Sequence, residues 1–273
     1  MTMRTAYLAA ALPLAALSAC ATVASDAPPP AAAAAAIKFD LGPPYIGGGL
    51  PGGDRLVPAP PAEGSQSLMR DEAHNAAHLE TAAGPRWQQA ARDAYLGPGW
   101  TGQSFDCAAG RTINDTATPA TARLLRRAGG DFAMSTSAVK ERYMRLRPFA
   151  VNGGPTCTPD DEQALRGNGS YPSGHAAIGY GTGLLLASLL PERAADLLAR
   201  GKAFAASRAI CNVHWTSDVE AGETIAAAAF ARLQADEAFR TDWAAARAEL
   251  AAVSAQPVDA VRCEQEQAAL ARR

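Results

Sequence analysis

Apolar residues recur along most of the chain at the three-and-four spacing of helices, and no stretch of useful length alternates in the manner of a strand. Capping and breaking residues divide this pattern into segments, because Ser and Pro favour helix starts whereas Gly favours helix ends. The pattern predicts an all-α fold, with helices over residues 65–82, 85–95, 118–127, 131–145, 159–166, 175–190, 194–210, 217–235 and 237–253.

Glycine-rich stretches are predicted to interrupt these helices. Gly129-Gly130 is expected to separate two of them, and residues 96–114 have the composition of a loop. Composition then favours a single domain, because the 273 residues are 48% hydrophobic but only 6% aromatic, and the predominant alanine suits closely packed helices. We expect one helical bundle over residues 56–255, preceded by an Ala-, Pro- and Gly-rich tether and arm over residues 20–55. The charged tail over residues 256–273 is expected to be loose unless Cys263 ties it down.

The first residues follow the three-part plan of a secretory signal: Arg4, then the apolar run 7–17, then small residues. Leu17-Ser18-Ala19-Cys20 resembles a bacterial lipobox, in which the cysteine becomes the lipidated first residue of the mature chain. Ala19-Cys20-Ala21 also fits cleavage of an ordinary signal peptide. We expect residues 1–19 to be removed and the protein to be periplasmic, attached to a membrane only through a lipid on Cys20.

The other cysteines and the charge narrow the choice of compartment and partner. Cys107, Cys157, Cys211 and Cys263 are an even number in an oxidising compartment, so two disulfides are expected; three pairings are possible, and free buried thiols are the alternative. A formal charge of −2 offers no basic excess for nucleic acid. The longest apolar run of the domain, residues 176–190, is shorter than the roughly 20 residues of a membrane span.

Pro172-Ser173-Gly174-His175 directly precedes this apolar helix. Ser173 is a natural N-cap, and the free N–H groups of the first turn point outward at the positive end of the helix dipole. Because Gly174 has no side chain, an oxyanion can approach the backbone there. A capped helix start explains Ser and Gly equally well but leaves His175 without a role.

His214 stands just before another predicted helix, and Asp218 lies in its first turn. Ser217-x-x-Glu220 has the pattern of a capping box. A carboxylate four positions after His214 can accept from one imidazole nitrogen and leave the other free to attack. On an unbroken helix Arg208 and His214 would point about 120° apart, so the chain is expected to break near Cys211-Asn212 if both bind one anion.

Lys140 and Arg147 are seven residues apart, which returns to nearly the same helical face, and Pro148 then ends the helix. Both cations could point into one pocket, although a solvated basic helix face that includes Arg145 is the simpler interpretation of this segment alone. His74 and His78 lie four apart and could form half of a metal site. We expect no metal there, because no third ligand is obvious nearby.

Taken in order, Lys140-x6-Arg147-Pro148, Pro172-Ser173-Gly174-His175 and Ser207-Arg208-x5-His214-x3-Asp218 resemble the three-part signature of the type 2 phosphatidic acid phosphatase superfamily. Residues 169–175 with 207–218 are similar, more narrowly, to the class A bacterial non-specific acid phosphatases. Ala176 departs from that signature, which usually continues with Thr. The resemblance implies the all-α bundle shared with vanadium haloperoxidases and a metal-free, cofactor-free hydrolysis. It implies that His214 is the nucleophile, Asp218 its orienter and His175 the general acid, with the phosphate oxygens held by Lys140, Arg147, Ser173, Gly174 and Arg208.

The function expected from this resemblance is an exported acid phosphatase of broad specificity for phosphate monoesters, with a phosphohistidine intermediate and possible phosphotransfer to alcohols. It also implies a homo-oligomer. An acid pH optimum, activity in EDTA and inhibition by vanadate are expected to follow. A vanadate-dependent haloperoxidase-like enzyme and a non-catalytic lipoprotein that retains the fold are the alternatives.

Overall fold

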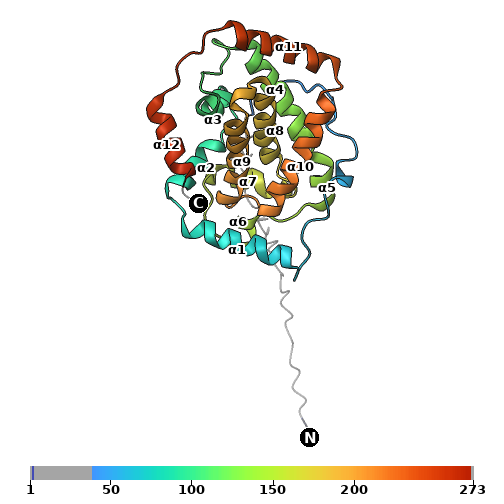
Figure 1. Cartoon of the computed structure of the whole chain (residues 1–273). Helices are drawn as coiled ribbons and strands as arrows, with labels where there is room; N and C mark the ends of the chain where they lie inside the picture. Colours follow the sequence, from blue (N-terminus) through green and yellow to red (C-terminus); the bar gives the residue numbers. More distant parts are fainter. Residues whose placement is uncertain (1, 3–38, 272–273) are drawn as a thin grey trace. The chain divides into compact units, whose positions relative to one another are not determined.

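A computed structural model of the chain describes residue 2 and residues 39–271. The chain divides into two units, Met1–Ala34 and Ala35–Arg273, and every described helix belongs to the second (Figure 1). The predicted signal peptide, Cys20 and most of the predicted tether lie outside the described residues.

The described residues form helices and no strands, which confirms the all-α fold. Three short 3-10 helices, η1 to η3, span Gly53–Arg55, Pro159–Asp161 and Pro191–Arg193. The α-helices are α1 (Gln66–Glu80), α2 (Pro85–Asp93), α3 (Trp100–Ala109), α4 (Pro119–Met134), α5 (Ser137–Tyr143), α6 (Pro148–Asn152), α7 (Glu162–Arg166), α8 (Gly174–Leu189), α9 (Ala194–Ile210), α10 (Thr216–Leu233), α11 (Glu237–Ala252) and α12 (Ala260–Leu270). None of the helices in this part of the chain is long and apolar enough to cross a bilayer.

Helix α8 forms the centre of the bundle, with α4, α9 and α10 packed around it (Figure 1). Helices α8 and α9 approach closely because small residues face one another. A Cβ added to Gly183 would lie 3.0 Å from the Cα of Gly201, and one added to Gly179 would overlap the Phe204 ring. The alanine- and glycine-rich composition therefore serves the contact that places the ends of α8 and α9 beside each other.

The prediction of a loop over residues 96–114 is wrong, because α3 (Trp100–Ala109) occupies the middle of this stretch. The glycines in this stretch mark the ends of the helix: Gly99 and Gly110 both have left-handed backbone angles, with φ of 81° and 66°. Between them, Trp100 and Phe105 are fully buried in the main core. Burial of these two aromatic side chains stabilises a helix that local composition does not favour.

The break predicted at Gly129-Gly130 is also wrong, since α4 runs through both glycines. They make room for the arm that precedes the bundle. A Cβ on Gly129 would lie 2.9 Å from a methyl carbon of Leu41, and one on Gly130 would lie 2.8 Å from the Gly42 carbonyl oxygen. The Asp131 carboxylate then accepts from the backbone N–H groups of residues 45 and 46, at 2.8 Å each, and anchors the arm on α4.

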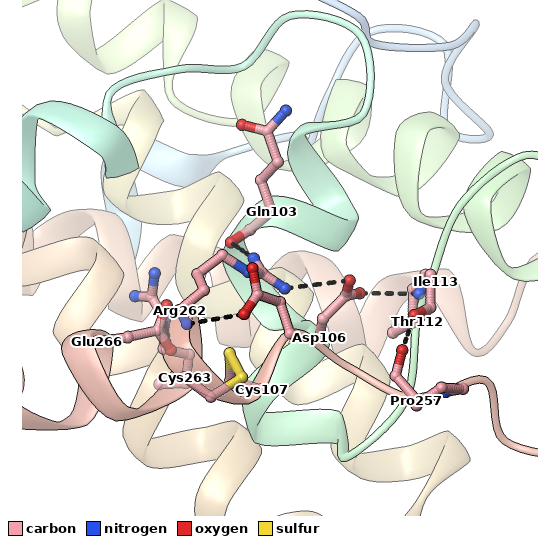
Figure 2. The surroundings of a disulfide bond; sticks show 11 residues. Gln103, Asp106, Cys107, Thr112, Ile113, Pro257, Arg262, Cys263 and Glu266 are labelled. Atoms are coloured by element: carbon pink, nitrogen blue, oxygen red, sulfur yellow. Dashed lines mark hydrogen bonds and ion pairs between the residues drawn. A yellow bond between two sulfur atoms is a disulfide. The ribbon is translucent and has the colours of Figure 1, made fainter.

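Two disulfides settle the cysteine pairing. Cys107 is bonded to Cys263 and Cys157 to Cys211, with Cα–Cα distances of 5.4 and 4.9 Å. The first joins α12 to α3, and Figure 2 shows Arg262 beside it, donating to the Gln103 carbonyl at 2.7 Å. The tail is thus tied down by Cys263 and is helical from residue 260.

Removing the Cys107–Cys263 bond by a double substitution to alanine is expected to lower the free energy of unfolding by about 3–5 kcal/mol. The bond joins residues 156 positions apart, and closing so long a loop removes much of the entropy of the unfolded chain. Urea unfolding of the double variant and of the oxidised wild type measures the difference. Equal midpoints and slopes would show that α12 is held by its packing alone.

Candidate active site

A cavity of about 430 Å³ lies beside the N-terminus of α8. One part of its wall is apolar and includes Phe39 and Leu41 from the arm, Leu96 from the segment before α3, and Met134 at the end of α4. The other part carries the polar residues of the predicted signature: Lys140, Arg147, Gly174, His175, Arg208 and His214. The fold therefore brings together six positions that are up to 74 residues apart in sequence (140 to 214).

His214 is presented by a sharp break after α9. The helix ends at Ile210, and Asn212 has a left-handed backbone with φ of 61°, as the predicted break near Cys211-Asn212 requires. Amide side chains hold this turn, because Asn75 donates to Asn212 Oδ1 at 2.8 Å and Asn152 does so at 3.0 Å. With the disulfide at Cys211, these contacts fix the backbone immediately before His214.

The ring of His214 is buried and its two nitrogens have different partners. Nδ1 lies 3.3 Å from Ser170 Oγ and 3.4 Å from Asp218 Oδ2, whereas Nε2 lies 3.0 Å from an N–H of Arg147. Since Arg147 can only donate, Nε2 is the acceptor and Nδ1 carries the proton. Burial, and then Arg147, Lys140 and Arg208, hold the pKa of His214 well below its usual value. The ring is therefore neutral, and its Nε2 lone pair faces Arg147.

Asp218 caps α10, and the capping box predicted between Ser217 and Glu220 is wrong. The N-cap is Trp215, whose backbone N–H donates to Asp218 Oδ2 at 2.8 Å. Glu220 forms a surface ion pair with Arg70 instead. Burial raises the pKa of Asp218, and the charge of Arg145 opposes this rise.

His175 lies in the first turn of α8, stacked on Phe204 with ring centroids 5.2 Å apart. Its Nε2 is 2.8 Å from the Asp93 carbonyl oxygen, so this nitrogen carries a proton. Burial, followed by the charge of Arg208, lowers the pKa of His175 well below its usual value. The ring is neutral at neutral pH unless an anion beside it offsets the field of Arg208.

Lys140 and Arg147 are fixed by backbone carbonyl groups. Lys140 Nζ donates to the carbonyls of Gly169 and Pro172 at 2.8 and 2.7 Å, which leaves one of its three N–H groups for another acceptor. Arg147 donates through Nε to Leu165 and through Nη1 to Val213. Burial and Arg147 lower the pKa of Lys140 to about 7, and burial and Arg208 lower the pKa of Arg147 to about 9.

Arg208, unlike Lys140 and Arg147, is not held by backbone carbonyl groups of the described chain. It is 3% exposed, and its Nε and Nη1 have no hydrogen-bond partner among the described residues. Burial lowers its pKa to about 10, so it remains charged at neutral pH. A buried guanidinium with unpaired N–H groups is costly unless an anion binds it. Arg208 is therefore the residue of the cavity wall best suited to bind an oxyanion through two hydrogen bonds.

Two residues of the predicted site lie behind this wall. Ser173 and Asp218 are completely buried and are not among the residues that line the cavity. Ser173 caps α8, as predicted, by accepting from the Ala176 N–H at 3.2 Å. Gly174 does line the cavity, and a Cβ there would also lie 3.1 Å from Thr136 Oγ1.

The structure adds side chains that sequence reasoning did not assign. Ser170 lies between His214 and Asp218, and Arg145 contacts Asp218 from the other side. Arg145 is not part of a solvated face, since its side chain is only 10% exposed. The pair His74 and His78 has no third ligand: the described residues contain no cluster of His, Cys, Asp and Glu able to hold a metal.

Comparison with known proteins identifies the family. The PAP2 superfamily profile matches residues 128–239, a range that includes all eight predicted catalytic and phosphate-binding positions. The chain is 41% identical over 197 residues to a non-specific acid phosphatase of Salmonella typhimurium, an alignment that covers 71% of this chain and 78% of the relative. It is 37% identical over 212 residues to an acid phosphatase of Zymomonas mobilis, with 77% and 80% covered. A non-specific acid phosphatase of Providencia stuartii is 39% identical over 199 residues, with 72% and 79% covered.

Such identity over most of both chains, together with a helical fold that brings six of the signature residues to one cavity, shows that this chain is an enzyme of the acid phosphatase family within the PAP2 superfamily.

Proposed function

We propose that this acid phosphatase hydrolyses phosphate monoesters of broad specificity in two steps, through a phosphohistidine on His214. One observation carries the proposal: two buried arginines, a half-buried lysine and two histidines line a single cavity. A phosphoryl transition state needs positive charge around its equatorial oxygens, a nucleophile on one side and a proton donor for the leaving oxygen on the other. Each of these requirements has a residue at the cavity.

In the first step His214 Nε2 forms a bond to phosphorus, and the bond from phosphorus to the ester oxygen breaks. The departing oxygen takes a proton from His175, which is protonated in the substrate complex, and the alcohol leaves. In the second step water attacks the phosphohistidine, gives a proton to His175, and displaces Nε2, so that phosphate is released and both rings return to their starting state. The Nδ1–H tautomer of His214 supports this role, because it leaves the lone pair on Nε2.

The cations are proposed to hold the phosphoryl oxygens. Arg208 supplies two unpartnered nitrogens, Nε and Nη1, Lys140 supplies one N–H, and Arg147 supplies an N–H that contacts the attacking nitrogen until the substrate binds. The first-turn N–H groups at Gly174 add the positive end of the α8 dipole. A bound phosphate dianion would offset the field of Arg208 and raise the pKa of His175, so substrate binding itself prepares the acid.

The finer features of the function rest on the same proposal. We infer that the domain over residues 56–255 acts on small-molecule phosphate esters, that alcohols can compete with water in the second step, and that it binds neither nucleic acid nor a cofactor. Export, removal of residues 1–19, lipidation of Cys20, periplasmic membrane attachment through the tether over residues 20–55, and assembly into a homo-oligomer remain predictions from the sequence.

A pH profile recorded after dialysis against EDTA tests the proposal. With p-nitrophenyl phosphate, we expect full activity in EDTA, an optimum on the acid side of neutral, and a fall in kcat/KM above about pH 7. The fall is expected because Lys140, whose pKa is about 7, is charged below that pH and loses its positive charge above it. Lys140→Arg keeps its charge and should extend the profile to higher pH. Activity that climbs into alkaline pH in the wild type, or that is lost on chelation, would contradict the proposal.

A further inference from the structure

Arg145 lies outside the superfamily signature but beside its carboxylate. Helix α5 ends at Tyr143, and Met144 has a left-handed backbone with φ of 41°, which turns the next side chain inward. This angle is uncommon for a residue with a side chain and costs conformational energy. The turn brings Arg145 Nη1 to 2.6 Å from Asp218 Oδ1 and 2.8 Å from Ser217 Oγ.

Asp71 holds the other end of the Arg145 guanidinium. It projects from α1, is fully buried, and its Oδ2 accepts from Arg145 Nη2 at 2.9 Å. Its oxygens also accept from the backbone N–H of Ser217 at 2.9 Å and from the Ser217 hydroxyl. Asp71 and Arg145 are thereby paired with each other, and Ser217 ties both to the first turn of α10, which carries Asp218.

The two oxygens of Asp218 have separate partners as a result. Oδ1 accepts from Arg145. Oδ2 accepts from the Ser170 hydroxyl and from the Trp215 N–H, and it faces His214 Nδ1. A hydroxyl that donates its proton to Asp218 has lone pairs left for the Nδ1–H of His214. Ser170 thus contacts both members of the pair, with its Oγ 3.3 Å from Nδ1 of His214, whereas Asp218 Oδ2 lies 3.4 Å from that nitrogen.

We propose that Arg145 and Asp71 are positioning residues for Asp218. Ser170, which donates to Asp218 and contacts Nδ1 of His214, then fixes the orientation of the His214 ring relative to this carboxylate. The proposal rests on the role of His214 as nucleophile. It explains why two buried carboxylates, Asp71 and Asp218, are placed around one guanidinium: the three charges are fixed by mutual hydrogen bonds, so the carboxylate behind His214 has one orientation.

The charges around Asp218 determine what removal of Arg145 would do. Besides Arg145, the groups that face it or act on it are Asp71 across the guanidinium, His214, Lys140, Arg147 and Tyr171. Burial already raises the pKa of Asp218, and Arg145 is the largest opposing influence. Without Arg145 this pKa rises further, so Asp218 becomes protonated, and unable to orient His214, at a higher pH than in the wild type.

The pH profiles of Arg145→Met and Asp71→Asn test the proposal. For Arg145→Met we expect the acid limb of kcat/KM to move up by about one pH unit or more, the effect of losing an adjacent opposite charge. Asp71→Asn removes a negative charge from the other side of Arg145, so its acid limb should move down. Arg142→Met is the matched control, because Arg142 lies on α5 three residues before Arg145, and its contacts are a surface ion pair with Asp54 and the ring of Tyr143; its profile should coincide with that of the wild type.

Opposite shifts of the two variants support the proposal, because a purely structural ion pair would lower activity by the same factor at every pH. Profiles of folded Arg145→Met and Asp71→Asn that are parallel to the wild type would overturn it. If Arg145→Met does not fold, the direction of the Asp71→Asn shift decides alone. Trapping of a phosphoenzyme on wild-type His214 separates the two proposals: parallel profiles with a trapped phosphohistidine reject only the positioning role, whereas absence of the phosphohistidine rejects the proposed function itself.

Discussion

Replacing His214 with alanine is expected to lower kcat for p-nitrophenyl phosphate by about 10⁴-fold or more, because the nitrogen proposed to form the covalent intermediate is lost. The variant should still bind tungstate, an oxyanion that mimics phosphate, since Lys140, Arg147 and Arg208 remain. Steady-state rates and calorimetric titration with tungstate measure the two effects separately.

His74→Ala is the matched control for this substitution. His74 is an exposed histidine on α1 whose Nδ1 lies 3.2 Å from Thr216 Oγ1, outside the cavity. Its removal should leave kcat unchanged. A His214→Ala enzyme that kept more than about 1% of wild-type kcat would contradict the assignment, because loss of a covalent nucleophile costs far more than that.

Arg208→Met is expected to lower kcat/KM by about 10²- to 10³-fold while leaving the free energy of unfolding unchanged or higher. The activity falls because a donor to the transition-state oxygens is lost. The stability does not fall because the buried guanidinium makes no hydrogen bond through Nε or Nη1 within the described chain, and an apolar side chain of similar length suits that environment better.

Arg200→Met, a substitution on the same helix, is expected to have the opposite effect on stability. Arg200 is as buried as Arg208, but it is paired with Asp93 and with Glu266 of α12. Its removal leaves two buried carboxylates without a counterion and should cost about 3–5 kcal/mol of unfolding free energy. Urea unfolding and kcat/KM of both variants give the comparison. Destabilisation of Arg208→Met as large as that of Arg200→Met would mean that Arg208 serves the fold rather than the substrate.

The helices that the sequence predicts well are those with a long apolar face or a clear start. Helix α9 begins and ends at the predicted residues 194 and 210, and Ser173 caps α8 as expected. These features are local: a side chain accepts from an N–H three residues on, and a periodic face packs on one neighbour. They can be predicted without knowing which segments meet.

The predictions that were wrong depend on contacts between distant segments. Residues 96–114 contain a helix because Trp100 and Phe105 reach the main core, and α4 continues through Gly129 because the arm packs against it. In both stretches the structural role of glycine cannot be inferred from composition alone. It marks helix ends at residues 99 and 110 but a close packing contact at residue 129.

The site shows the same division between local and distant information. The signature positions were predictable because their chemistry and spacing are specific, and the fold places six of them at one cavity. Arg145 was not, because arginines are common in this chain and only the turn at Met144 directs this one toward Asp218. Asp71 and Ser170 could be found only once α1 and the segment before α8 were seen beside α10.

The disulfides could be expected but not paired from sequence. Four cysteines allow three arrangements, and the choice depends on which segments the fold brings within about 6 Å of each other. In the structure, the bond at Cys211 secures the turn before His214, and the bond at Cys263 secures the C-terminal helix. One of the two therefore contributes to the geometry of the cavity as well as to stability.

The most informative measurement is rapid-quench trapping of the enzyme during turnover of a radiolabelled phosphate ester, followed by location of the label in the chain. The label should be stable in base and labile in acid, as a phosphorus–nitrogen bond is, and it should map to His214 in the wild type and be absent from His214→Ala. A label of equal amount in His214→Ala, or one that maps to any other residue, would show that His214 is not the nucleophile.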